Sequence, residues 1–384
     1  MKITGVSVLE YSRPLDGRSW NPLFRWTERR APLLLIEAGN GLTGAGEAWC
    51  RQPAIGSLLA HLADTVAPRL LGAEVPDSAA IARIGVQARS SAPPGGEPWI
   101  APAAASAIDM ALWDLFARSR GQPLWQALGG ASGQVRVYAS GGLYRDGDGI
   151  DELAAEMRRH VDAGFRAVKM KVGAMPLPID LERVRAVRGA VGADAELWVD
   201  AVNQLNGETA VPWAMALSGT GAQAIQAPVP FSDVATMARI NADCLPVIAG
   251  EAEFDMAGFG RLLAADALTL VQPCLGLCGG FTSATRLAAR AQGLLVDITP
   301  QTFGTAVMQA ASLHWGAATA GVHSVEYHRF HDHLAAIMPA GMRTVTGGRV
   351  ALGEEPGLGV AIPPPGPQDD GGDIRRHRRL TMHH

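Results

Sequence analysis

The sequence predicts an α/β fold whose main part is a barrel of parallel strands. Three observations support this prediction. Between residue 135 and about residue 326, short apolar segments alternate with Ala-, Leu- and Arg-rich stretches of helical periodicity, such as Leu153–Val161. The apolar segments follow one another at intervals of roughly 20 to 30 residues, the length of one βα unit. Several of them end in polar residues, and in such barrels the chemistry sits at the C-terminal ends of the strands.

We place each strand end where an apolar segment stops. The predicted ends are Ser140, Lys171, Asp200, Gln226, Glu251, Gln272 and Pro300, with an eighth strand near Glu326. Eight parallel βα units of this kind close into a TIM-type barrel.

The first 50 residues predict a β-meander with a long first connection. Its three strands are expected at Ile3–Leu9, Leu33–Glu37 and Gly44–Trp49. From Ile55 to about Ala127 the apolar spacing is helical instead. These residues therefore form a second region of mixed α and β structure beside the barrel.

The connection between the first two strands, Ser12–Arg30, is rich in arginine and tryptophan. A long irregular segment of this kind is either a binding lid or an ordinary surface loop with snorkelling arginines. As a lid, it would close over a polar, anionic substrate. The substrate-binding side chains that we assign to this region are Trp20, Arg25, Trp26, Trp49 and Arg51.

Composition excludes several classes of function. The chain has 384 residues, a net charge of −4 and an isoelectric point near 6.2, which leaves no basic footprint for nucleic acid or an anionic membrane. Four cysteines without zinc-type spacing indicate a reducing compartment and no disulfide framework. We find neither a signal-peptide pattern nor an uninterrupted apolar run long enough for a bilayer, so a cytoplasmic protein is expected.

The end of the chain differs in composition from the rest. Residues Pro363–Pro367 are proline-rich and Arg375–Arg379 are basic. We expect a solvated tail here, and we set His383 and His384 aside from the fold.

Two lysines carry the strongest functional signal. Lys169 and Lys171 lie two residues apart in an apolar segment that stops at Gly173. Residues i and i+2 of a strand face the same side, so both ammonium groups enter one space. Alone, such a pair is more typical of a solvated strand face than of a functional site.

The strands that follow the lysines favour a functional site. Asp200, Gln226 and Glu251 end three consecutive apolar segments. A single strand-terminal carboxylate is usually a helix cap, but three oxygen-bearing ends opposite a lysine pair would ring one mouth of the barrel. Hard oxygen ligands of this kind suit Mg²⁺.

The order of these motifs resembles the mandelate racemase-type branch of the enolase superfamily. The resemblance covers residues 1 to about 362 and rests on the lysine pair, the three strand ends and several further stretches: Gln272-Pro273, Gly279-Gly280, Ala111–Leu115, Gly121–Leu124, Leu128–Gly130 and Pro356–Val360. It implies a modified (β/α)7β barrel beneath an α+β capping domain built from both chain ends. The domains would be residues 1–130, 131–340 and a returning segment with its tail, 341–384.

The resemblance also implies a chemistry, abstraction of the proton α to a carboxylate with the enediolate held on Mg²⁺. Asp200, Gln226 and Glu251 would hold the metal ion. Lys171 would be the base, its pKa lowered by Lys169 and the metal, while charged Lys169 would hold the substrate carboxylate. Glu326 matches a strand-eight glutamate that donates a proton to the enolate, which requires burial to keep it neutral.

Three positions depart from the family pattern. Gln226 stands where the family has a glutamate, so one negative charge is lost and we expect weak or substrate-assisted Mg²⁺ binding. Gln301 and Cys274 stand at the positions of a His/Asp dyad that serves the second substrate face. Neither replaces that dyad, so a two-base racemase is disfavoured; we assign both to substrate binding instead.

These observations leave three functions open. The first is syn dehydration of a sugar acid or related hydroxy acid to a 2-keto acid, with Lys171 as the single base. The second is a racemase or epimerase that uses an unrecognised second base, His328 or His323. The third is a degenerate barrel that binds acids without converting them. We expect a small carboxylate substrate, no nucleic-acid or membrane partner, and a homo-oligomer.

Overall fold

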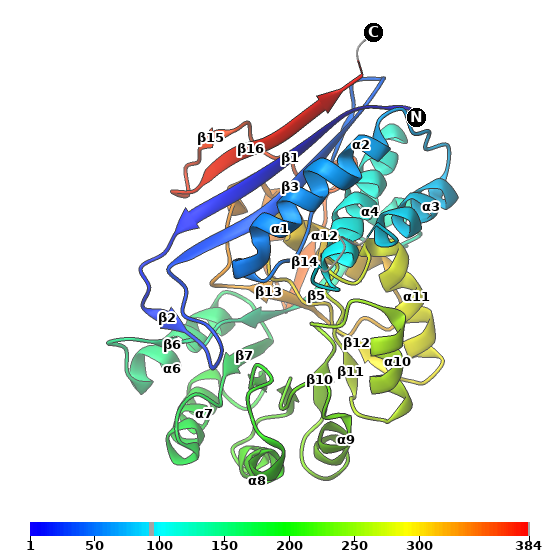
Figure 1. The fold of residues 1–384 in the computed structure, drawn as a ribbon. Helices are drawn as coiled ribbons and strands as arrows, with labels where there is room; N and C mark the ends of the chain where they lie inside the picture. Colours follow the sequence, from blue (N-terminus) through cyan, green and yellow to red (C-terminus); the bar gives the residue numbers. More distant parts are fainter. Residues whose placement is uncertain (92–95, 383–384) are drawn as a thin grey trace.

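The computed structural model describes residues 1–91 and 96–382, and its centre is a ring of parallel strands (Figure 1). In the described chain the ring has eight strands: β5 (Gln134–Ser140), β7 (Ala167–Lys171), β8 (Glu196–Asp200), β9 (Ala224–Gln226), β10 (Val247–Ala249), β11 (Leu270–Val271), β12 (Asp297–Ile298) and β13 (Val325–His328). Backbone hydrogen bonds from His323 to Ile298 (2.8 Å) and from Glu326 to Pro300 (3.2 Å) join the last strand region to β12 and close the ring. The predicted α/β barrel is confirmed.

A helix follows each of the first seven strands. These helices are α6 (Ile150–Asp162), α7 (Leu177–Val191), α8 (Gly207–Ser218), α9 (Val234–Asp243), α10 (Met256–Ala264), α11 (Gly280–Gln292) and α12 (Ala306–Ala318). Several begin at a side chain that accepts a hydrogen bond from the first turn: Asn206, Asp233, Asp255 and Thr305. Before the chain returns to the cap, only short elements follow β13 within the described residues: η3 (Ala335–Ile337), α13 (Ala340–Arg343) and β14 (Arg349–Ala351), so the barrel is of (β/α)7β type.

The interior of the barrel is filled by side chains and is not a pore. One buried cluster occupies it: Tyr138, Ala167, Trp198, Ala224, Ile248 and Leu270. The rings of Tyr138 and Trp198 lie 4.6 Å apart between centroids. This packed layer leaves the C-terminal mouth of the barrel as the place for polar chemistry.

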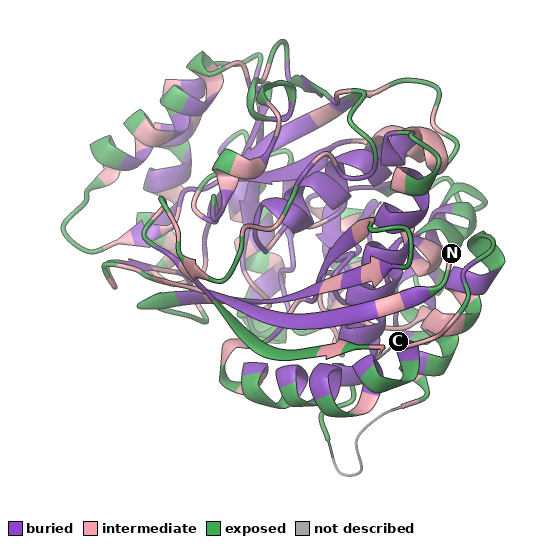
Figure 2. Cartoon of the chain, turned by 90° about the horizontal axis from the view of Figure 1, so that it is seen from above, coloured by how far each residue is buried: buried purple, intermediate pink, exposed green. Residues whose placement is uncertain are grey.

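A second sheet covers the barrel and comes from both ends of the chain, as predicted. Its order is β15–β16–β1–β3–β4, made of β1 (Ile3–Pro14), β3 (Glu28–Ala38), β4 (Thr43–Glu47), β15 (Gly366–Pro367) and β16 (Asp373–Thr381). Figure 1 shows the red C-terminal strand beside the blue N-terminal one. The prediction of a purely solvated tail was therefore wrong. The side chains of β16 are mostly exposed, but its backbone pairs with buried β1 from residue 5 to residue 12 (Figure 2).

The predicted lid is shorter than expected, because β1 and β3 pair along their whole length, from Ile3 to Pro14. Only about residues 15–27 remain between them. Within that span, β2 (Ser19–Trp20) pairs with β6 (Tyr144–Arg145), which follows the first barrel strand. The lid is thus joined to the barrel by a two-residue ladder.

Helices pack between the cap sheet and the barrel. They are η1 (Gln52–Ala54), α1 (Ile55–Ala60), η2 (His61–Val66), α2 (Ala67–Leu70), α3 (Ser78–Arg89), α4 (Ile100–Ser119) and α5 (Leu124–Ala127). Helix α4 is long and apolar enough to cross a bilayer by composition alone, but 94% of that stretch is buried within this fold, as expected of a core helix. At Gly46 of β4 a Cβ atom would lie 2.0 Å from the carbonyl oxygen of Ala107, so only glycine lets the strand and α4 approach this closely.

Candidate active site

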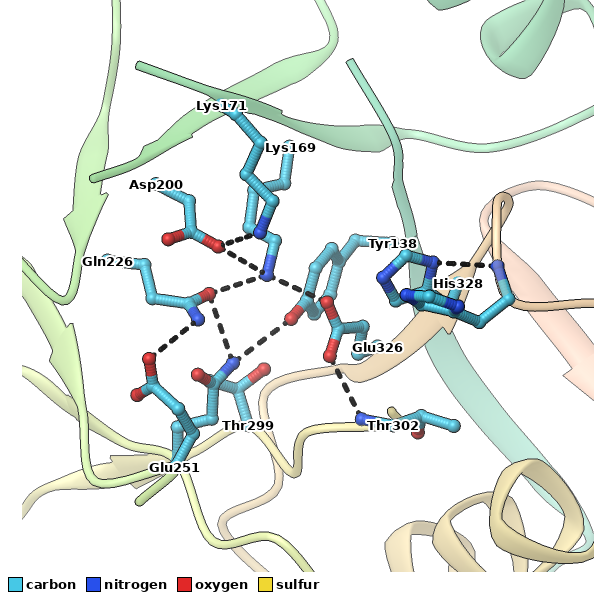
Figure 3. A network of polar contacts seen from close by, with 12 residues as sticks. Tyr138, Lys169, Lys171, Asp200, Gln226, Glu251, Thr299, Thr302, Glu326 and His328 are labelled. Carbon is cyan, nitrogen blue, oxygen red and sulfur yellow. Dashed lines mark hydrogen bonds and ion pairs between the residues drawn. The ribbon is translucent and has the colours of Figure 1, made fainter. Parts of the chain in front are cut away.

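Three neighbouring strands bring the predicted chemical groups together. In the parallel ladder Lys171 pairs with Asp200, and Asp200 pairs with Gln226. Glu251 follows β10 by two residues, and Glu326 lies on β13. Figure 3 shows all of these side chains directed toward one another at the barrel mouth. The expectation that the amines and the oxygen groups share one space is confirmed.

The two lysines have different partners. Lys171 Nζ donates to Asp200 Oδ2 at 2.5 Å. Lys169 Nζ donates to Gln226 Oε1 at 2.6 Å and to Glu326 Oε1 at 2.7 Å, and it lies 3.2 Å from Asp200 Oδ2. Lys169 is therefore held from three sides, whereas Lys171 has one charged partner, Asp200, among the described residues.

The charges at Lys169 and Glu326 support each other. Burial opposes ionisation, but the neighbouring side chains of Glu326, Tyr138 and Asp200 raise the pKa of Lys169 well above its ordinary value. Burial alone would likewise raise the pKa of Glu326, yet the Lys169 ammonium outweighs it and holds that pKa below 4.5. The expectation of a neutral Glu326 was wrong, because its nearest partner is a cation. Glu326 here is a carboxylate that accepts hydrogen bonds from Lys169 and from the backbone N–H of Thr302 (2.9 Å).

Glu251 is the least satisfied group of the site. Its Oε1 accepts a hydrogen bond from Gln226 Nε2 at 3.3 Å, but its buried Oε2 has no partner among the described residues. Burial and the nearby Asp200 carboxylate raise the pKa of Glu251 to about 7. Two buried carboxylates with an orphan oxygen form an arrangement that a bound cation would relieve.

The donor set fits Mg²⁺, though with only two charged ligands. Asp200 and Glu251 supply carboxylates and Gln226 supplies an amide, all hard oxygen donors. No group of three His, Cys, Asp or Glu side chains suited to a metal occurs within residues 1–91 and 96–382. The Gln226 side-chain oxygen already accepts hydrogen bonds from Lys169 Nζ and from Gln272 Nε2 (3.3 Å). These two donors would compete with a metal ion for that oxygen. These contacts agree with the weak metal binding expected from the sequence.

The raised pKa of Glu251 predicts a stability that depends on pH in the metal-free protein. In the unfolded chain this glutamate titrates near 4.5 and in the folded chain near 7, so the folded state binds more protons between these values. The stability contribution of Glu251 is therefore present below pH 4.5 and is lost as the pH rises to 7. We expect the free energy of unfolding of the parent to fall by up to about 3 kcal/mol relative to that of Glu251→Gln between pH 4.5 and pH 7. Urea denaturation with a chelator present measures both values. Parallel pH curves for the two proteins would contradict the prediction.

A small, partly open cavity of about 30 Å³ lies beside the lysines. Five predicted site residues line it: Lys169, Lys171, Glu326, Trp26 and Gln301. Five further residues that we did not assign to substrate binding also line it: Asn21, Leu143, Phe303, His328 and His331. Three histidines lie at the end of the last strand and just after it: His328, His331 and His333. Their close spacing was a signal in the sequence, and of the three we used only His328, as a possible base.

Two predicted lid residues lie outside this cavity and fasten the lid instead. Trp20 stacks on Tyr144 with 4.7 Å between ring centroids, and its Nε1 donates to Asp146 Oδ1 at 3.0 Å. Arg25 Nη1 donates to Asp146 Oδ2 at 2.6 Å. Asp146 is thus the point on the barrel to which both lid side chains bind.

Removing that anchor should loosen the lid without unfolding the protein. For Asp146→Ala we expect faster proteolysis between residues 15 and 27 and a nearly unchanged melting temperature, since exposed ion pairs add little to global stability. Timed digestion followed by mass spectrometry gives the cleavage sites. Asp151→Ala, on the exposed face of α6, is the matched control. Equal cleavage rates in the two variants would show that Asp146 does not hold the lid.

Three other predicted residues also lie away from the cavity. Trp49 packs edge-on against Trp99, with 6.1 Å between ring centroids, and Arg51 is exposed at the surface. Cys274 is a fully buried free thiol in the apolar cluster of the cap. The expectation that they share this space was wrong. Trp49 and Arg51 lie away from the cavity because the chain after β4 continues into the cap helices, and Cys274 does because its side chain packs into the apolar cluster of the cap. His323 precedes β13 and contacts Arg136 at 3.1 Å, at the opposite end of the barrel.

The two dyad positions do meet in space. Cys274 and Gln301 form an isolated parallel bridge at adjacent strand ends, and the backbone N–H of Gln301 donates to the carbonyl of Pro273 at 2.9 Å. The two positions that the resemblance assigns to the dyad are therefore neighbours at adjacent strand ends. Neither side chain, an amide and a buried thiol, reproduces it.

Comparison with known families agrees with this geometry. Residues 152–365 match the family described as "Enolase C-terminal domain-like", and residues 23–129 match the "Mandelate racemase / muconate lactonizing enzyme, N-terminal domain". The chain belongs to the mandelate racemase/muconate lactonizing enzyme family of the enolase superfamily. It is 30% identical to a D-galactarolactone cycloisomerase of Agrobacterium fabrum, over 94% of this chain and 97% of that one.

Other members of the family are similarly related. An arabinonate dehydratase of Saccharolobus solfataricus is 27% identical, over 70% of this chain and 72% of its own length. The crystal structure of an L-talarate dehydratase from Polaromonas sp. JS666, complexed with Mg and L-glucarate, superposes with a TM-score of 0.83 at 25% identity. It covers 100% of this chain and 99% of that one. Further relatives are named cycloisomerases, dehydratases and epimerases, so this family member is an enzyme of the lyase or isomerase type, with acid dehydratase or epimerase chemistry.

Proposed function

We propose that this enzyme removes water from a sugar acid or a related hydroxy acid to give a 2-keto acid, with Lys171 as its only base. The observation that carries the proposal is the asymmetry of the cavity. Lys171 lines it with a single charged partner, while the positions of the opposite dyad hold Gln301 and Cys274. A neutral amide and a buried thiol cannot cycle a proton near pH 7.

Mg²⁺ belongs to the proposal, held by Asp200 and Glu251 with Gln226 as an uncharged third ligand. When bound there it would act as a Lewis acid on the substrate carboxylate. Asp200 also accepts a hydrogen bond from Lys171 Nζ, so a metal ion held by Asp200 would compete with that contact and leave Lys171 free to meet the substrate.

The residues of the chain then act in a defined order. Charged Lys169 faces the substrate carboxylate and offsets the negative charge that grows on it. Lys171 Nζ takes the α-proton, and the C–H electron pair forms a carbon–carbon double bond as the β-C–O bond breaks. The departing hydroxyl receives the proton back from Lys171 on the same face and leaves as water. The resulting enol tautomerises to the 2-keto acid.

A screen of mono- and diacid sugars for 2-keto acid product, with Mg²⁺ present, tests the proposal. We expect product from the parent and a loss of at least about a hundredfold in Lys171→Ala, the scale of a lost general base. Lys2→Ala, far from the site in sequence and fold, controls for expression and handling. Equal product from parent and Lys171→Ala would remove Lys171 as the base.

Epimerisation is the second candidate, because His328 lines the same cavity as Lys171. The two reactions differ in their labelled products. Incorporation of solvent deuterium at the α-carbon of unreacted substrate, with inversion and without loss of hydroxyl, would favour the epimerase.

A further inference from the structure

The imidazole of His328 is positioned by the backbone that follows it. His328 is the last residue of β13, is 6% exposed and lines the cavity with Lys169 and Lys171. Its Nδ1 lies 3.2 Å from the backbone N–H of His331 and 3.3 Å from that of Phe330. Two N–H groups aimed at one ring atom require that atom to be an unprotonated nitrogen.

This contact settles which nitrogen of the neutral ring carries hydrogen. With Nδ1 as acceptor, the hydrogen is on Nε2. Nε2 lies on the other side of the ring from Nδ1, away from the loop and toward the side of Lys171 and Glu326 (Figure 3). The cavity therefore faces a hydrogen-bond donor.

The groups around His328 keep it neutral. Burial has the largest effect and disfavours the charged ring. Glu326, on the same strand, favours the charged ring, but the ammonium groups of Lys171 and Lys169 and the guanidinium of Arg29 disfavour it. Together they lower the pKa of His328 to about 3. His331 packs against it with 4.3 Å between ring centroids and is itself buried and neutral, with its pKa well below the ordinary value.

Acting as a second base would cost His328 these contacts. To accept a proton at Nε2, the ring must either be the other tautomer or become imidazolium, and both put a hydrogen on Nδ1. That hydrogen would face the N–H groups of Phe330 and His331, leaving two backbone donors without an acceptor. The same two hydrogen bonds that hold the ring therefore oppose its use as a base.

We infer that His328 is a neutral hydrogen-bond donor in catalysis: its Nε2–H binds the substrate oxygen that gains negative charge beside Lys171. This inference rests on the proposed function and adds a residue to it. Glu326 cannot serve as that donor, because it is a carboxylate paired with Lys169. No proton leaves His328 in this role; the hydrogen bond strengthens as charge develops and weakens as product forms.

Nitrogen NMR of the free enzyme tests the tautomer without any turnover. Protein labelled with ¹⁵N-histidine, with His328→Gln used to assign the signal, should show the Nε2–H form of His328 from pH 5 to pH 8. Added oxalate, a planar dianion that resembles an enediolate, should shift the Nε2–H proton resonance. Finding the Nδ1–H tautomer, or imidazolium at pH 7, would overturn the inference.

Two variants of His328 separate a donor from a base. The amide nitrogen of glutamine reaches about as far as Nε2 and donates, whereas leucine fills a similar volume without a donor. We expect His328→Gln to keep product formation within about tenfold of the parent and His328→Leu to lose about a hundredfold, as for a missing oxyanion donor. A base would be lost in both, so equal losses would overturn the inference.

Oxalate binding keeps this inference distinct from the proposed reaction. If no sugar acid gives product, calorimetry with oxalate and Mg²⁺ still compares the two variants. Oxalate binding about tenfold weaker in His328→Leu than in His328→Gln would support the role of His328 as a hydrogen-bond donor. In that case only the proposed dehydration reaction would be rejected. Equal binding in the two variants would remove the donor.

Discussion

Replacing Lys169 with methionine is expected to destabilise the protein by about 3 to 5 kcal/mol at pH 7. The ammonium of Lys169 is fully buried and lies within 3.2 Å of two carboxylates, Glu326 and Asp200. Without it, the Glu326 charge stays buried with no cation in contact, and breaking a buried pair costs roughly this amount. Urea denaturation of parent and variant at pH 7 measures the difference.

The pH dependence of that deficit gives a sharper test. In the parent, Lys169 holds the pKa of Glu326 below 4.5. In Lys169→Met the pKa of Glu326 should rise, because burial then acts unopposed. The stability deficit of the variant should therefore shrink as the pH falls and Glu326 binds a proton. The double variant Lys169→Met/Glu326→Gln should recover part of the stability at pH 7. A deficit below about 1 kcal/mol that does not vary with pH would show that the pair is not coupled in this way.

Replacing Gln226 with glutamate is expected to tighten Mg²⁺ binding by about ten- to a hundredfold. The change restores a third carboxylate beside Asp200 and Glu251, and at an effective dielectric constant near 20 its gross attraction to a divalent ion exceeds the loss on desolvation. The new carboxylate would also meet Lys169, now 2.6 Å from the amide oxygen, which limits the gain. Titration calorimetry of substrate-free protein gives the dissociation constant directly.

The control for this variant is Gln272→Glu. Gln272 is buried in the same network and donates to Gln226 and Tyr138, but it is not one of the three assigned ligands. A carboxylate there should not improve Mg²⁺ affinity by the same factor. A parent dissociation constant already in the low micromolar range would contradict the weak site, as would no gain from Gln226→Glu.

Local signals in the sequence were enough to predict the barrel and its mouth. The predicted ends at Ser140, Lys171, Asp200 and Gln226 coincide with the ends of β5, β7, β8 and β9. Each combines a mainly apolar segment with a polar last residue, and parallel strands place their last residues at one edge. Lys171 and Asp200 could therefore be predicted as neighbours without coordinates.

Tertiary contacts decided the features that were missed. The tail looked solvated because its proline and arginine content is typical of an exposed end, but β1 offers an open edge that only a distant segment can cover. Trp20 and Arg25 looked like substrate ligands because their chemistry suits an anion, yet Asp146, more than a hundred residues away, already binds both. The charge state of Glu326 depends on a lysine 157 positions earlier, which no local pattern reveals.

The order in which the chain leaves the ribosome gives the cap a particular vulnerability. Strand β16 covers the outer edge of β1, yet almost the entire polypeptide separates the two. During synthesis, the outer edge of β1 stays unpaired until the residues of β16 have left the ribosome. A premature stop near residue 365 would leave it bare permanently, as a template on which another truncated copy could pair and aggregate.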